Sequence, residues 1–279
     1  MSHSYGSLIT EVRDQVATIK MLSVEEGARR TPPADIHWDL QAVLNELRED
    51  HSVRVIVITG AHDGEFLVPR PTSRYTSEWP DSIANPNHAW KLMVGIIRLH
   101  TTMAEIEKPI LAKVNGDAIG FGQSVMFSSD LIVARQDAVV SDVHLSQGTV
   151  LSGQDRVPVG SPFGTVPGDG AGATVPLFMP PVKAKEYLML STELTAAELA
   201  AMNCINYAVP AEDLDAISDD LVKRLLSKSA FALAWTKRVA NRHVIDQLNK
   251  ALDAGVAYEM INLAQIQRLE SKNAVTLTE

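Results

Sequence analysis

The sequence predicts an α/β protein in which short buried strands alternate with amphipathic helices, followed by a helical region. Two observations carry this prediction. Val53–Thr59, VRVIVIT, is a continuous β-branched run of the kind found in strands that are covered on both faces. From Val182 onward, apolar stripes repeat at helical spacing. With 279 residues, 46% of them hydrophobic, the chain can bury a full core. We expect this core over residues 1-195 and the helical region over 196-279.

The first part of the chain is predicted to form a hairpin, a helix and a buried strand. Ser7–Glu11 and Gln15–Met21 have the apolar, β-branched composition of two short strands. Thr31-Pro32-Pro33 opens the helix, because Thr suits the cap and Pro the first turn. The strand Val53–Thr59 follows. Ala61–Asn87 is rich in Pro, Ser, Arg and His and is predicted to be a long loop, which in a compact domain is usually functional or mobile.

A second cycle is centred on Lys108–Asp130. We expect a helix over Asn87–Glu107, a strand over Ile110–Asn115, a glycine-spaced turn over Gly116–Gly122 and a helix over Gln123–Ser128. The remaining expected elements are strands at Leu131–Ala134 and Ala138–Ser141, an irregular segment at Asp142–Gly172, and helices at Lys183–Leu190, Thr195–Met202, Leu214–Ser227, Ala230–Gln247 and Leu248–Glu270.

The turn around Phe121 is the first candidate for chemistry. A strand that breaks at glycines and restarts as a helix leaves N–H groups unpaired in the first helical turn, where they can hold an anion or a developing oxyanion. Gly120 and Gly122 flank Phe121, so its N–H can approach a ligand closely. The spacing matches neither the dinucleotide fingerprint nor the phosphate loop. A tight packing turn would explain the same residues.

Composition excludes several classes of function. A formal net charge of -9 argues against nucleic acid as the main partner. The single cysteine, Cys204, rules out an internal disulfide and any cysteine-rich metal site, and it suits a reducing compartment. No stretch has the pattern of an export signal or the length of a membrane span. We therefore expect a cytoplasmic protein that binds a small molecule and uses no metal, nucleic acid or membrane.

The order of the motifs resembles the enoyl-CoA hydratase/isomerase, or crotonase, family from about Leu8 to the C-terminal helices. The stretches that carry the resemblance are VRVIVITGAHDGEF, KPILAKVNGDAIGFG, SDLIVARQDAVVSDVHL, TVPGDGAG and ELTAAELAAMNCINYAVPAEDLD. The resemblance implies the ClpP/crotonase-like spiral of ββα units, with a C-terminal region that forms a homotrimer or a dimer of trimers. It also implies no tightly bound cofactor, with CoA entering as part of the substrate.

The same resemblance implies an oxyanion hole made by the backbone N–H groups of Arg70 and Phe121. Arg70 stands between two prolines, which cannot donate. Hydratases of the family use two glutamates, and this chain has Ser124 and His144 at those positions. His144 together with Asp169, in Pro-Gly-Asp-Gly, resembles the 6-oxocamphor hydrolase branch, which cleaves β-diketones with a His/Asp pair that activates water.

A histidine that is oriented by a carboxylate is physically suited to acid/base catalysis near neutral pH. We therefore assign catalysis to His144 and Asp169, although a satisfied half-buried histidine and a helix-capping Asp would explain the same residues. The residues expected to bind substrate are Gly120, Gly122, Ser124, Tyr75 and Trp79.

Three functions stay open on the sequence. The first is an enzyme that forms the enolate of a CoA thioester or related carbonyl compound in an oxyanion hole, with hydration, isomerisation or hydrolysis as the outcome. The second is a carbon–carbon hydrolase of a β-diketone. The third is a non-catalytic subunit that binds acyl-CoA or serves in assembly.

Overall fold

The computed structural model describes residues 5–22, 36–69, 86–146, 149–152, 155–158 and 164–276. Its strands are β1 (Leu8–Arg13), β2 (Val16–Met21), β3 (Val55–Gly60), β4 (Gly64–Leu67), β5 (Ile110–Val114), β6 (Gly116–Ile119), β7 (Leu131–Arg135), β8 (Val139–Ser141), β9 (Thr149–Ser152), β10 (Asp155–Pro158), β11 (Leu194–Thr195) and β12 (Tyr207–Val209). Its helices are α2 (Ile36–Glu49), α4 (Pro86–Glu105), α5 (Phe121–Phe127), α6 (Ala171–Phe178), α7 (Pro181–Leu190), α8 (Ala196–Ala201), η1 (Ala211–Asp213), α9 (Leu214–Leu226), α10 (Ala230–Ala240) and α11 (Arg242–Thr276).

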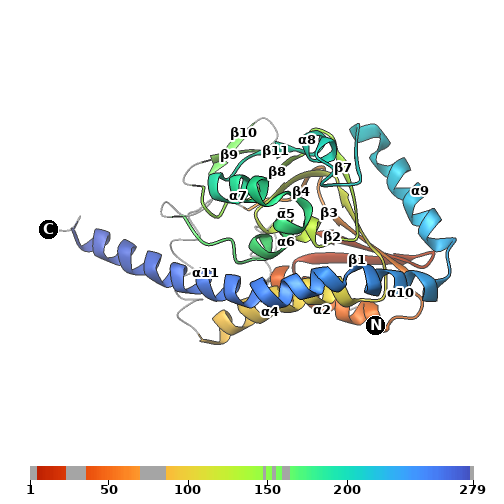
Figure 1. Cartoon of the computed structure of the whole chain (residues 1–279), viewed down its shortest axis with the longest axis horizontal. Helices are drawn as coiled ribbons and strands as arrows, with labels where there is room; N and C mark the ends of the chain where they lie inside the picture. The colour runs from red at the N-terminus through yellow and green to blue at the C-terminus, as the bar shows by residue number, and fades with distance from the viewer. Residues whose placement is uncertain are drawn as a thin grey trace.

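Two sheets form the body of the fold (Figure 1). One is a six-stranded sheet in the order β1-β2-β3-β5-β7-β12, in which every pair except β1–β2 is parallel. The other has four strands in the order β11-β8-β6-β4. The chain passes from the first sheet to the second three times, from β3 to β4, from β5 to β6 and from β7 to β8. This repeat confirms the predicted α/β class and its strand-strand-helix units.

Glycines make the passage between the sheets possible. A Cβ atom on Gly60 would lie 1.8 Å from the carbonyl oxygen of Glu65, and one on Gly116 would lie 1.8 Å from the carbonyl carbon of Gly64. Asn115 joins the two crossings, because its side-chain oxygen accepts a hydrogen bond of 2.9 Å from the Gly60 N–H. The chain segments therefore cross at backbone contact, which no larger residue allows.

The six-stranded sheet is apolar on both faces. Successive residues of a strand point to opposite sides of the sheet, so a continuous apolar run places apolar side chains on both. On one face, Ile56, Ile58, Ile110 and Ala112 belong to the same core cluster as Leu40 and Leu44 of α2 and Leu99 of α4. On the other face, Val57, Leu111 and Val133 pack with Leu214 and Leu221 of α9. The continuous apolar run that predicted the buried strand is explained by these two layers.

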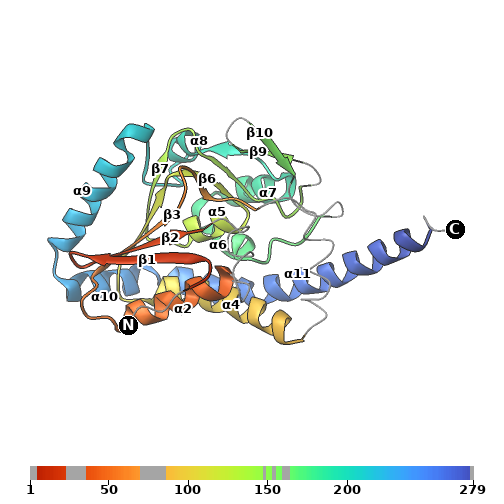
Figure 2. The ribbon, with the colours of Figure 1, turned by 180° about the vertical axis from the view of Figure 1, so that it is seen from behind.

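The C-terminal helices are joined closely to the sheets. β12 extends the larger sheet beside β7, and α11 runs along α4 before its end projects past the other elements (Figures 1 and 2). The predicted capping box of Thr195 and Glu198 is confirmed at the start of α8.

None of the helices in the described ranges has an apolar stretch that would cross a membrane. The division into 1-195 and 196-279 stays a prediction.

The expected boundaries were wrong in several places. The predicted loop Ala61–Asn87 contains β4, and the predicted turn Gly116–Gly122 consists mostly of β6, so that only Gly120 turns and the helix begins at Phe121. β4 and β6 are short, contain Gly and acidic residues, and pair with each other. Their pairing therefore outweighs a weak local strand propensity.

Two further expectations were wrong in the second half of the chain. The segment Asp142–Gly172 was expected to be irregular, but β9 and β10 form an antiparallel hairpin within it. The break expected between residues 247 and 248 lies instead at Asn241, so that α11 runs without interruption from Arg242.

A buried ion pair fixes α10 to the edge of the core. The ammonium group of Lys237 lies 2.7 Å from the carboxylate of Asp130 and donates a hydrogen bond of 3.0 Å to the carbonyl of Lys108. Asp130 also accepts a bond of 2.7 Å from the N–H of Ile110, the first residue of β5. Burial lowers the pKa of Lys237 and raises the pKa of Asp130, and their mutual attraction opposes both shifts.

We expect Lys237→Met to lower the free energy of unfolding by about 3 kcal/mol, because it leaves the Asp130 carboxylate buried without its cation. Urea unfolding followed by circular dichroism measures the change. Lys183→Met is the matched control, because the pair of Lys183 with Glu186 is largely exposed and should contribute little. Equal unfolding midpoints for the two variants would contradict the structural role of the buried pair.

Candidate active site

Asp142 and His144 follow β8 directly and lie at the end of the four-stranded sheet. The Asp142 side chain is fully buried, and it accepts a hydrogen bond of 3.1 Å from the His144 backbone N–H. Both of its carboxylate oxygens lie 3.2 Å from Nδ1 of His144. A carboxylate can only accept, so Nδ1 carries a proton in either charge state of the ring. The second ring nitrogen, Nε2, is therefore available to groups on the side of the ring away from Asp142.

Two further carboxylates face Nε2 of His144. Asp169, in the loop before α6, has its Oδ2 3.7 Å away, and Glu259 of α11 has its Oε1 3.6 Å away. Both residues are buried, with exposed fractions of 5% and 8%. The two distances exceed hydrogen-bond length. A water molecule or a substrate atom between these groups could therefore contact all three.

Asp169 is held by the helix that begins at the glycine turn. The hydroxyl of Ser124 in α5 donates a hydrogen bond of 2.9 Å to Oδ1 of Asp169 and accepts one of 3.0 Å from the side-chain amide of Gln123. The N–H of Ala171, the first residue of α6, also approaches the same Oδ1 at 3.4 Å. Ser124 is fully buried, and its contact with substrate stays a prediction.

Glu259 reaches the site because α11 packs against a glycine. A Cβ atom on Gly168 would lie 2.6 Å from the Gly255 carbonyl and 2.6 Å from the Glu259 carboxylate. The side chain of Asn262 accepts a hydrogen bond of 3.0 Å from the N–H of Val166. Glu259 was not predicted from the sequence. Its signal was a Gly inside a helix, followed at i+4 and i+7 by polar residues on the same face.

The carboxylates determine how the site holds protons. Burial by itself lowers the pKa of His144, but the charges of Asp169 and Asp142, together with Glu259, raise it well above its ordinary value of 6.5. Burial raises the pKa of Glu259, which the charge of His144 partly offsets. The pKa of the buried Tyr187 hydroxyl is also raised, by burial and by Asp142 and Asp169. These coupled groups form an acid/base cluster.

The glycine turn places the backbone N–H of Phe121 next to this cluster. Phe121 is the first residue of α5, after Gly120 with φ 60°. No residue in the described part of the chain accepts a hydrogen bond from its N–H. The Gly120 N–H donates a bond of 2.9 Å to the Ser141 carbonyl, so this turn lies beside the end of β8. A Cβ on Gly122 would lie 2.3 Å from the Leu67 oxygen, which explains the second glycine.

The other expected oxyanion donor, Arg70, lies outside the described residues, as do Tyr75 and Trp79. The residue before Arg70 is described. The Pro69 ring would come within 3.8 Å of a Cβ on Gly120, so the loop after β4 reaches the glycine turn. Arg70 follows directly, and its role as the second donor stays a prediction.

A second histidine at this turn was missed in the sequence. The ring of His37 in α2 packs on the ring of Phe121, with centroids 4.0 Å apart. His37 also acts electrostatically on Glu259 and on the buried His100. Its signal in the sequence was weak, because it lies in the first turn of an ordinary amphipathic helix.

Asp142, His144 and Asp169 also have the composition of a cation site, with one ligand atom from each lying within 4.8 Å of the others. Asp142, however, faces Nδ1, whereas Asp169 faces Nε2. Nδ1 is thus already held at hydrogen-bond distance by Asp142, and Nε2 is the ring nitrogen that remains for other groups.

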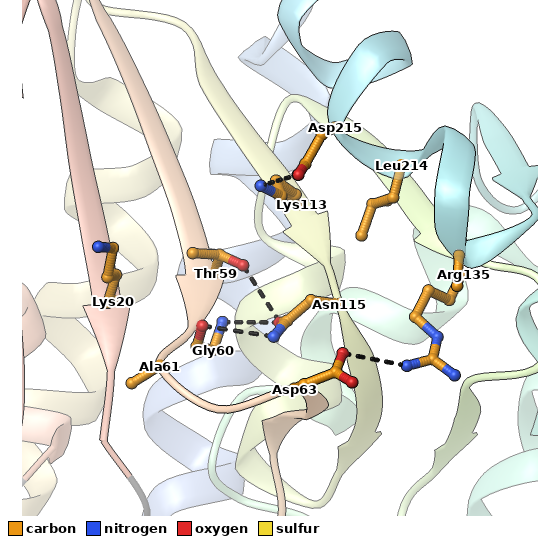
Figure 3. Close-up of a pocket in the computed structure, with 11 residues that line it drawn as sticks. Lys20, Thr59, Gly60, Ala61, Asp63, Lys113, Asn115, Arg135, Leu214 and Asp215 are labelled. Atoms are coloured by element: carbon orange, nitrogen blue, oxygen red, sulfur yellow. Dashed lines mark hydrogen bonds and ion pairs between the residues drawn. The ribbon is translucent and has the colours of Figure 1, made fainter.

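A separate cavity of about 270 Å³ lies at the carboxyl ends of the parallel strands, next to α9 (Figure 3). It is lined by the cations Lys20, Lys113 and Arg135. Each of them already faces a carboxylate: Glu11 at 2.9 Å for Lys20, Asp215 for Lys113, and both Asp63 and Asp137 for Arg135. Its charges are therefore compensated within the protein, and we assign it no ligand.

Residues 15–275 match the family model described as enoyl-CoA hydratase/isomerase. Among curated proteins, the crotonyl-CoA hydratase of Syntrophomonas wolfei is 23% identical over 249 residues, which cover 89% of this chain and 86% of that protein.

Solved structures align with the fold of this chain over most of its length. An enoyl-CoA hydratase/isomerase from Mycobacterium paratuberculosis aligns with a TM-score of 0.78 at 22% identity, over 94% of this chain and 96% of the other. A β-diketone hydrolase from Anabaena sp. PCC 7120, bound to (S)-3-oxocyclohexyl acetic acid, aligns with a TM-score of 0.75 at 19% identity, over the same shares. At these identities the likeness establishes the fold alone.

Asp142→Asn is expected to lower the pKa of His144, because it removes a negative charge that stabilises the imidazolium. A ¹⁵N NMR titration of the His144 ring measures this pKa directly. Asp137→Asn is the control, because that carboxylate pairs with Arg135 at the protein surface and should leave His144 unchanged. The assignment of Asp142 would be wrong if both variants titrated at the wild-type pH.

Proposed function

The chain belongs to the enoyl-CoA hydratase/isomerase family, and within it we propose an enzyme that converts a carbonyl substrate through an enolate, with His144 carrying the protons. One observation supports this most. Nδ1 of His144 is held by Asp142, while Nε2 faces Asp169 at 3.7 Å and Glu259 at 3.6 Å. The N–H of Phe121, beside the same strand end, is the proposed oxyanion donor.

Among the enolate reactions we favour hydrolysis of the carbon–carbon bond of a β-diketone. Water addition in the family's hydratases uses two glutamates. Here one position holds Ser124, whose hydroxyl is bound to Asp169, and the other holds His144. An imidazole between two carboxylates is suited to activating water. The solved neighbour from Anabaena that is a β-diketone hydrolase agrees with this proposal.

In the first step, water lies between Nε2 of His144 and the carboxylates of Asp169 and Glu259. The neutral imidazole takes one proton from the water, and the water oxygen bonds to one carbonyl carbon of the substrate. Asp142 stabilises the imidazolium that forms. The carbonyl oxygen of the tetrahedral intermediate now carries the negative charge.

In the second step, that oxygen reforms its carbonyl group, and the bond between the carbonyl carbon and the central carbon breaks. The electron pair passes to the central carbon and is delocalised as an enolate onto the second carbonyl oxygen, which the N–H of Phe121 stabilises, with Arg70 as the second proposed donor. His144 then returns its proton to the central carbon. The products are a ketone and a carboxylic acid, which are joined in one keto acid when the diketone is cyclic, and one water is consumed.

The other candidate is hydration or isomerisation of an enoyl-CoA. Asp169 and Glu259 would then supply the two carboxylates, and the crotonyl-CoA hydratase relative favours this alternative. In both cases we propose a small-molecule substrate, no tightly bound cofactor and a homotrimer or dimer of trimers. A non-catalytic subunit would bind such compounds without converting them.

The two reactions are separated by assaying the wild type on a cyclic 1,3-diketone and on crotonyl-CoA. We expect turnover of the diketone, and His144→Ala should lower its kcat/KM by at least about 100-fold, because the proton carrier is lost. Leu145→Ala, at the partly exposed neighbouring position, is the control and should retain the rate. Turnover of crotonyl-CoA alone would select the alternative, and tight binding without turnover would select the non-catalytic subunit.

The pH profile should follow the protonation of His144. The base must be neutral to accept a proton, so kcat/KM should rise with pH through the pKa of His144 in the free enzyme. That pKa is raised, so we expect the midpoint of the rise above 6.5. Asp142→Asn should move the rise to lower pH, whereas a profile that falls over this range would contradict His144 as the base.

A further inference from the structure

His100 is a buried histidine that the proposed chemistry does not use. It lies in α4, and only 1% of its surface is exposed. Its Nε2 lies 2.7 Å from the main-chain carbonyl oxygen of Asp169, and its Nδ1 lies 2.6 Å from the hydroxyl of Ser128. The ring therefore connects α4, the end of α5 and the loop that carries Asp169.

The two partners determine the tautomer of His100. A carbonyl oxygen can only accept, so Nε2 must carry the hydrogen that binds Asp169. Burial lowers the pKa of His100, with the Asp169 carbonyl and carboxylate opposing it and His37 adding to it, so the ring is neutral near pH 7. Nδ1 then has no hydrogen and accepts from the Ser128 hydroxyl at 2.6 Å, in competition with the Ser124 carbonyl, which lies 2.8 Å from the same hydroxyl. One tautomer therefore satisfies both sides of the ring.

The loop is shaped to receive this ring. Gly170 has φ 118°, and a Cβ atom there would lie 2.0 Å from Nε2 of His100. A side chain at Gly170 would therefore displace the imidazole. The hydrogen bond to Asp169 and the contact with Gly170 together fix the main chain at the residue whose carboxylate faces His144.

We propose that His100 is a positioning residue that directs the Asp169 carboxylate toward His144. His100 holds the main chain of Asp169, and Ser124 holds Oδ1 of its side chain at 2.9 Å. Oδ2 is thereby left to face Nε2 of His144 at 3.7 Å. The effect of His100 on catalysis rests on the proposed role of His144 as the proton carrier.

A matched pair of variants separates this role from mere packing. In His100→Gln, the side-chain amide nitrogen can take the place of Nε2 and donate to the Asp169 carbonyl. In His100→Asn, the amide ends near the place of Nδ1, and the bond to Asp169 is lost. We expect Gln to keep the wild-type behaviour, while Asn lowers kcat on the diketone about 10-fold to 100-fold with little change in KM.

The pKa of His144 gives a readout that does not depend on activity. Among the described residues, the charged groups that face His144 are Asp142, Asp169 and Glu259, with Tyr187 close by, and only Asp169 is expected to move. A ¹⁵N NMR titration should show a lower pKa of His144 in His100→Asn and the wild-type pKa in His100→Gln. Unchanged or equal pKa values in the two variants would overturn the positioning role, even if no substrate is found.

The wild type provides a test that requires no variant to fold. The ¹⁵N shifts of His100 should report a neutral ring with its hydrogen on Nε2 near pH 7. A neutral ring with the hydrogen on Nδ1 would overturn the proposal, because it could not donate to Asp169. Failure to turn over any diketone, with the expected tautomer and pKa pattern present, would instead count against the proposed function alone.

Discussion

The arrangement of the site depends on burying three carboxylates around a single imidazole. Carboxylates leave water at a high free-energy cost unless charges or hydrogen bonds compensate them. His144 supplies the positive charge, its own backbone N–H bonds Asp142, and Ser124 bonds Asp169. The pKa of His144 is raised because the same carboxylates stabilise its protonated ring. It also makes the neutral ring a stronger base than a free histidine.

The fold supplies these groups from three different parts of the chain. The end of β8 carries Asp142 and His144, the loop before α6 carries Asp169, and α11 carries Glu259. These parts come together through contacts with glycine backbone, at Gly168 against α11 and at the crossings between the two sheets. The precision of the site thus depends on positions that have no side chain of their own.

The sequence predicted strongly patterned elements and local motifs, and it failed where distant segments decide. The run VRVIVIT and the capping box at Thr195 were identified correctly because their signals are local. His144 and Asp169 were paired through resemblance, and the structure places them 3.7 Å apart. Glu259 and His37 were missed because each lies on an ordinary helix, and only tertiary packing brings them to the site. The strands β4 and β6 were missed because their pairing with each other, and not their local sequence, determines that they form.

Glu259 lies on a helix that belongs to neither sheet. An exchange of one acidic side chain there would alter the number of protons that the cluster stores, while the strands and their crossings stayed intact. In this architecture the chemistry of the site can therefore change while the two sheets stay the same. Glu259 is itself buried against Gly168, so a substitution there would repack the loop before α6 and leave both sheets unchanged.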